Sequence, residues 1–222
     1  MKNFIATYKR FFSDKRALRL TGFALLLLAL SLIINYYAWT YASIKESNSV
    51  TDIILSNIRA FDVDALFVYA TFLSLLGIVI YCIKKPFQIP YIVKSIALFV
   101  VIRSVFVTLT HVGPFPTSLP IDKTLTFFTI FSHFSFTWDL FFSGHTWLPF
   151  LFALILWDNK ILRYVCIGIS VFFAVIVLLW HYHYSIDVLS AFFITYGIYH
   201  LSLILFPRDK KHFDDSFKPI SL

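Results

Sequence analysis

The sequence HYHYSIDVLSAFF, residues 181–193, places two histidines and one aspartate at the head of an apolar segment. His183 and Asp187 are one helical turn apart, so a helix would present both side chains on one face. A carboxylate in that position orients an imidazole ring, fixes its tautomer and raises its basicity. An ionisable pair is costly within a membrane segment, which favours a catalytic role. His181 shares the segment and is a candidate for contact with a substrate.

The sequence SGHT, residues 143–146, supplies a further histidine at the start of another apolar segment. His145 follows a Ser143-Gly144 turn, and the N–H groups at a helix N-terminus bind anions, phosphate in particular. Arg103 is expected at a similar depth and is a candidate to clamp the non-bridging oxygens of a phosphoryl group. These groups suit phosphoryl transfer through a phosphohistidine, in which one histidine attacks phosphorus and another donates a proton to the leaving alkoxide.

The composition is that of an integral membrane protein. Of 222 residues, 59% are hydrophobic, 20% aromatic and 14% charged, and the mean hydropathy is +0.79. Such values lie far outside the usual range for a soluble domain. The net charge of +7 does not indicate nucleic-acid binding, because Lys and Arg are spread between apolar segments. The two cysteines show no disulfide or metal-binding pattern, and nothing in the sequence calls for a cofactor.

The apolar pattern predicts an all-α membrane protein that crosses the bilayer six times. Each segment approaches the roughly 20 apolar residues that a membrane helix needs, although the fourth is short. The predicted helices are 18–41, 63–83, 90–111, 144–158, 161–181 and 184–206. We interpret the chain, residues 1–222, as a single membrane-embedded domain.

The distribution of positive charge predicts the orientation of these helices. Most of the 19 Lys and Arg residues lie in the N-terminal tail, in two turns on the same side and in the tail 209–222. The positive-inside rule makes that side cytoplasmic, so both chain termini are expected inside the cell. The SGHT and HYSID sequences then open their helices at the opposite, outer face. The segment 47–57 is predicted to be a polar outer loop.

These segments resemble the phosphatidic acid phosphatase type 2 (PAP2) superfamily, and within it the sphingomyelin synthase branch most closely. The branch pattern C-G-D-x-x-x-S-G-H-T is matched from Asp139 to Thr146. The pattern H-x-H-Y-S/T-I/V-D-V-x-x-A-Y/F-Y/F is matched over 181–193, and RSVFVTLTHVGPFP from Arg103 is similar to a further block. The chain departs from the branch at Thr137 and Trp138, where the pattern has Cys and Gly.

The resemblance implies a PAP2-like helical bundle with no metal requirement and a site that faces the lumen, periplasm or exterior. By matching position, His183 is the nucleophile, Asp187 its orienting partner and His145 the general acid and base. Asp139 is a candidate to hold an amide or a cationic head group.

A Ser-Arg pair precedes the nucleophile in other lipid phosphatases that the chain resembles. Ile176 and Val177 stand at those positions here. Arg103 is therefore the candidate phosphate clamp, with Ser143 and Gly144 beside it.

The expected function is that of a membrane lipid phosphatase or phosphotransferase. In one version a phospho-head group passes from a glycerophospholipid to a lipid alcohol such as ceramide. In the other version water is the acceptor. The alternative class is a non-enzymatic transporter or a metal-binding membrane protein, with ligands drawn from His111, His133, His145, His181 and His183.

Overall fold

The computed structural model describes residues 2–45, 47–119 and 143–216. Within these ranges every regular element is a helix, which confirms the all-α prediction. The elements are α1 (Lys2–Ser13), α2 (Lys15–Ile44), α3 (Asp64–Lys84), the 3-10 turn η1 (Pro86–Gln88), α4 (Ile89–Leu109), α6 (Gly144–Ile155), α7 (Lys160–Leu179), α8 (Ser185–Leu205) and α9 (Pro207–Asp215).

Five of these helices are long and apolar enough to cross a membrane, namely α2, α3, α4, α7 and α8. Their bounds lie close to the predicted ones. The helix α6 was predicted to be short, and at 12 residues it is shorter still than the predicted 144–158. Its length corresponds to about 18 Å, less than the roughly 30 Å thickness of a bilayer core.

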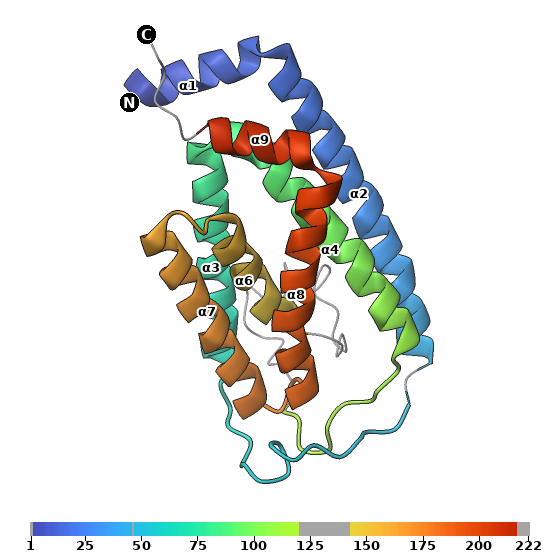
Figure 1. Cartoon of the computed structure of the whole chain (residues 1–222). Helices are drawn as coiled ribbons and strands as arrows, with labels where there is room; N and C mark the ends of the chain where they lie inside the picture. The colour runs from blue at the N-terminus through green and yellow to red at the C-terminus, as the bar shows by residue number, and fades with distance from the viewer. Residues whose placement is uncertain (1, 46, 120–142, 217–222) are drawn as a thin grey trace.

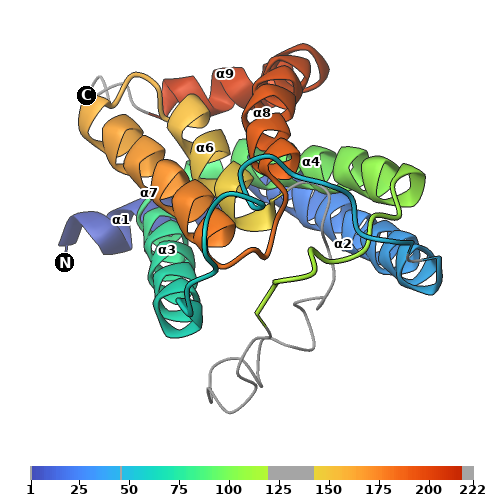
Figure 2. The same cartoon turned by 90° about the horizontal axis from the view of Figure 1, so that it is seen from below.

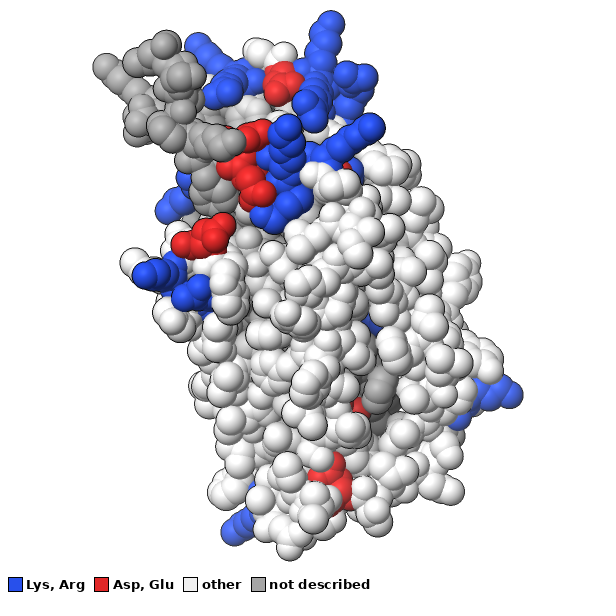
Figure 3. All heavy atoms as spheres, viewed as in Figure 1, with Lys and Arg blue, Asp and Glu red and all other residues white. Residues whose placement is uncertain are grey.

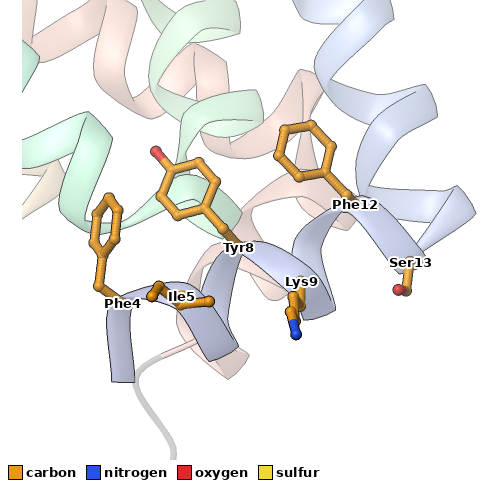
Figure 4. A pocket seen from close by; sticks show the side chains of 6 residues that line it. All are labelled: Phe4, Ile5, Tyr8, Lys9, Phe12 and Ser13. Atoms are coloured by element: carbon orange, nitrogen blue, oxygen red, sulfur yellow. The ribbon is translucent and has the colours of Figure 1, made fainter. Parts of the chain in front are cut away.

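Among the described residues, α1 and α9 form helices where the sequence predicted tails, and this corrects that prediction for those residues. In α1, Tyr8 and Phe11 face the body of the protein: the Tyr8 hydroxyl donates to the Ile83 carbonyl at 2.9 Å, and Phe11 is buried. Phe4 and Phe12 remain exposed, so α1 is amphipathic. A groove of about 530 Å³ runs along α1, and Figure 4 shows the side chains that line it, among them Phe4, Tyr8 and Phe12.

The helices form a bundle in which α6 takes a central place. The helix α6 packs against α7 and α8, while α2 packs along α4 at one side (Figure 1). The view from below shows α6 between α7 and α8 (Figure 2). Trp147 of α6 stacks on Phe99 of α4, with ring centroids 3.6 Å apart, and the Ser170 hydroxyl of α7 donates to the Thr146 carbonyl at 2.7 Å. These contacts fix the start of α6 inside the protein.

A buried ion pair connects α4 to α9 at the end of the bundle that carries α1. Lys94 Nζ lies 2.7 Å from Asp209 Oδ1, and both side chains are more than nine-tenths buried. The ammonium also lies over the rings of Phe23 and Phe206. Lys and Arg gather on the surface at this same end, above a broad band almost without charge (Figure 3).

Candidate active site

The end of α7 places His181 in an unusual backbone conformation. The Tyr182 N–H donates to the Val177 carbonyl at 3.0 Å, and the His181 N–H donates to the Leu178 carbonyl at 3.0 Å. This pair of bonds is a Schellman motif, whose first residue past the helix adopts the left-handed conformation and is usually glycine. His181 has a φ of 56°. The chain therefore folds back over the last turn of α7 and carries the next residues into the bundle.

The His181 ring is held in a buried position by this turn. Its Nδ1 lies 2.5 Å from the Thr117 hydroxyl, and its ring packs edge-on against Phe115 at 5.5 Å. The side chain is 2% exposed, and Nε2 has no hydrogen-bond partner among the described residues. A buried ring nitrogen without a partner is costly, which makes it a natural contact for a bound substrate.

His183 and Asp187 meet as the sequence predicted, but not by the predicted route. His183 precedes α8, which begins at Ser185, so the two residues do not share one helix face. The turn before α8 nevertheless brings His183 Nδ1 to 3.7 Å from Asp187 Oδ2. The same carboxylate oxygen accepts a 3.0 Å hydrogen bond from the Tyr184 N–H, which fixes its direction. Both side chains are almost fully buried.

The start of α6 lies against the start of α8. The Ser143 N–H donates to the Asp187 carbonyl at 3.4 Å, and the Thr146 hydroxyl donates to Ser143 Oγ at 3.0 Å. His145, the second residue of α6, packs edge-on against Phe67 of α3 at 4.3 Å. Its Nδ1 is buried with no hydrogen-bond partner in the described ranges. The SGHT turn thus presents an imidazole and the N-terminal amides of α6 at one point.

Arg103 of α4 completes this cluster. It is buried, with 7% of its surface exposed. A Cβ on Gly144 would lie 4.0 Å from Arg103 Nη2, so the guanidinium lies directly beside the SGHT turn. His145 interacts electrostatically with both His183 and Arg103, and Asp187 interacts with His183 and Arg103. Four ionisable groups from α4, α6 and the start of α8 therefore converge.

A loop remote in the sequence supports this cluster from outside. Asp52 Oδ2 accepts hydrogen bonds from the Ser185 N–H at 2.7 Å and the Ser185 hydroxyl at 2.8 Å. The Tyr184 hydroxyl donates to the Gly113 carbonyl at 2.8 Å and accepts from the Val50 N–H at 3.2 Å. Burial opposes ionisation of Asp52, but its hydrogen bonds outweigh that effect and lower the pKa of this carboxyl.

Sequence reasoning missed Asp52, Thr117 and the role of the Tyr184 hydroxyl. Asp52 lies in the segment read only as a polar loop, and no local pattern separates it from its neighbours. Thr117 follows the block that begins at Arg103, which was the only available signal. The predicted substrate contact Asp139 lies outside the described residues.

A family comparison covers both histidine segments. A family model described as PAP2 superfamily C-terminal matches residues 136–204. This match supports placement of the chain in the PAP2 superfamily. It also supports an enzyme with lipid phosphatase-type activity that acts on membrane lipids. No curated protein and no solved structure matched the chain.

The geometry offers no ready-made metal centre in the part of the chain that the structure describes. No group of three or more His, Cys, Asp or Glu side chains is arranged there to hold a metal ion. His133, one of the ligands considered for a metal-binding protein, lies outside that part.

Proposed function

We propose that the protein is an integral membrane lipid phosphotransferase or phosphatase that works through a phosphohistidine at His183. The observation that carries the proposal is the convergence of His183, Asp187, His145 and Arg103, all from separate turns or helices, beside the amides of α6. Phosphoryl transfer requires a nucleophile, a proton donor and positive groups around phosphorus, and these four side chains supply them.

The first half of the proposed reaction transfers phosphorus to the enzyme. Arg103 and the amides at the start of α6 hold the non-bridging oxygens. Asp187 faces Nδ1 of His183, so the attacking atom is Nε2, which forms a bond to phosphorus in line with the leaving oxygen. That oxygen takes a proton from His145 and departs as the lipid alcohol.

The second half regenerates the enzyme. His145, now neutral, accepts a proton from the acceptor hydroxyl as its oxygen attacks phosphorus. The bond from phosphorus to Nε2 of His183 breaks, and the ring returns to its starting state. If water is the acceptor, the products are a free phosphate or phospho-head group. If a lipid alcohol such as ceramide is the acceptor, the product is a new phospholipid, as the resemblance to the sphingomyelin synthase branch favours.

The experiment that tests the proposal is mass spectrometry of lipid products. Purified protein is added to vesicles that contain phosphatidylcholine, phosphatidylethanolamine, phosphatidic acid and ceramide, with His183→Ala as the control. A ceramide phospholipid formed together with diacylglycerol identifies the transferase. Diacylglycerol with free phosphate or a free phospho-head group identifies the hydrolase. Equal lipid profiles for both proteins would overturn the proposal for these substrates.

A chelation experiment separates this proposal from a metal-dependent alternative. Activity that survives a strong chelator but is lost in His183→Ala excludes a catalytic metal. Vanadate should inhibit the enzyme, because its trigonal-bipyramidal form mimics in-line phosphoryl transfer.

We propose further that both termini face the cytoplasm and that the site opens on the other face. The gathering of Lys and Arg at the end that carries α1 and α9 supports this orientation (Figure 3). Labelling of single cysteines introduced at exposed positions of α1 and of the loop 47–57 tests it. The loop should react with an impermeant thiol reagent on intact cells, and α1 should react only after permeabilisation.

A further inference from the structure

The two oxygens of the Asp52 carboxylate accept hydrogen bonds from different parts of the protein: one from its own loop and the other from α8. Oδ1 accepts from the Ile54 N–H at 2.8 Å and the Leu55 N–H at 3.0 Å. Oδ2 accepts from the Ser185 N–H and hydroxyl. Asp52 is 6% exposed, and Leu55, which anchors the same turn, is 2% exposed. With four donors already bound, this carboxylate serves the protein structure and is not arranged to bind a substrate.

The partner of Asp52 is the first amide of α8. Ser185 begins the helix, where backbone N–H groups have no partner within the helix. Such amides are usually capped by a neighbouring side chain, but Asp52 caps this one from a segment far away in the sequence. Its negative charge at a helix N-terminus is also favourable. The capped residue, Ser185, lies between His183 and Asp187 in the chain. The distance between those two side chains determines whether Asp187 can orient the His183 ring.

A second tether holds the same loop on its other side. The Tyr184 hydroxyl joins Val50 to Gly113, and the Gly113 N–H donates to the Asn48 carbonyl at 3.3 Å. Gly113 approaches the loop so closely that a Cβ there would lie 2.3 Å from the Ser47 carbonyl oxygen. The loop is thus fixed against two neighbouring segments before Asp52 reaches α8. A carboxylate on such a fixed support can hold the first turn of α8 in one register.

We propose that Asp52 is a positioning residue, which holds the first turn of α8 so that the carboxylate of Asp187 faces the ring of His183. The inference rests on the proposed function for its catalytic consequence, because it assigns Asp187 and His183 their roles. The contact between Asp52 and Ser185 is a feature of the fold and does not depend on the proposed function. It acts on the orientation of the nucleophile and leaves the phosphate contacts at Arg103 unchanged.

The test compares Asp52→Asn with Asp62→Asn, a matched change at an exposed carboxylate at the end of the same connection. The first measurement is hydrogen exchange of peptides that cover 181–188. Asp52→Asn should accelerate exchange there at least fivefold, and Asp62→Asn should not. The second measurement is the lipid reaction, in which Asp52→Asn should lower kcat at least tenfold with KM changed less than twofold.

A milder variant, Ser185→Ala, keeps the proposal testable if Asp52→Asn does not fold. Ser185→Ala removes the hydroxyl contact but keeps the N–H that Asp52 binds, so kcat should fall about two- to fivefold while the melting temperature falls by only a few degrees. If Asp52→Asn cannot be purified, this intermediate fall in kcat supports the proposal, and wild-type kcat in Ser185→Ala overturns it.

The remaining outcomes separate the tether from the proposed chemistry. Unchanged exchange over 181–188 in Asp52→Asn refutes the tether. Faster exchange with wild-type kcat, or a change confined to KM, refutes the positioning role. A wild-type protein inactive on every lipid contradicts the proposed function instead, while the exchange data still report on the tether.

Discussion

His181 occupies a backbone position at which glycine is the usual residue, so replacement by glycine and by alanine should have different effects. A non-glycine residue in the left-handed region costs about 1–2 kcal/mol, and glycine avoids that cost. Glycine also makes the unfolded chain more flexible, which offsets about 0.4–1 kcal/mol. The His181→Gly variant should therefore be more stable than His181→Ala, by about 0.5–1 kcal/mol.

Both variants lose the contacts of the imidazole ring. The hydrogen bond with Thr117 contributes about 1 kcal/mol, and the edge-on contact with Phe115 contributes about 0.5–1.5 kcal/mol. We expect His181→Ala to be about 2 kcal/mol less stable than the wild type and His181→Gly about 1 kcal/mol less stable. Thermal unfolding in detergent, followed by tryptophan fluorescence, gives the order of the three proteins.

The lipid reaction then tests the ring itself. If Nε2 of His181 binds the phospho-head group, its loss removes a hydrogen bond to a charged group, which is worth about 1.5–3 kcal/mol. Both variants should therefore lose about 10- to 100-fold in kcat/KM. Wild-type kcat/KM in the more stable glycine variant would refute the binding role. An alanine variant at least as stable as the glycine variant would refute the backbone reasoning.

Three further changes test other parts of the structure. Lys94→Ala leaves the carboxylate of Asp209 buried without its partner and should cost about 3–5 kcal/mol, whereas Lys210→Ala, at a more exposed pair, should cost less than about 1 kcal/mol; thermal unfolding compares them. Because the folded-state pKa of Asp52 is lowered, its stabilisation is complete above the unfolded value of 3.8 and is lost as the pH falls through the folded value. Protection from hydrogen exchange over 181–188, relative to the intrinsic exchange rate at each pH, should therefore fall below about pH 4 in the wild type, and in Asp52→Asn it should already be low at neutral pH. Asp187→Asn should lower kcat by about 100-fold or more in the lipid assay, and a loss below tenfold would contradict its orienting role.

The membrane helices could be predicted from the sequence because long apolar runs have a single stable solution in a bilayer. Hydrogen bonds within each helix satisfy the backbone, so composition alone determines α2, α3, α4, α7 and α8 to within a few residues. The short helices α1 and α9 were missed because they are amphipathic: α1 is rich in Lys, Arg and aromatic residues, and α9 is rich in Lys and Asp. Their packing against the bundle stabilises them, and that packing is a tertiary property.

Some residues of the candidate site could also be predicted from the sequence, whereas the contacts between them could not. His183, Asp187 and His145 were recognisable because ionisable residues at the head of apolar segments are rare. Their approach depends on a turn in which His181 adopts a left-handed conformation, and no residue in the sequence indicates that turn. The contact from Asp52 to Ser185 spans 133 positions, so only the folded chain could reveal it.

Because α6 is short, its first turn, which carries His145, lies beside α7 before the end of that helix. The His145 ring is 5.9 Å from that of Phe173, and α7 continues to Leu179. Those six further residues correspond to about 9 Å of helix. In the proposed reaction a phosphate must therefore pass the end of α7 and lose part of its hydration before His183 can attack it. In the proposed reaction the lipid alcohol leaves from this buried position, to which bulk water has little access. We therefore expect the access of water and of lipid alcohols to this buried position to determine which acceptor the proposed enzyme uses.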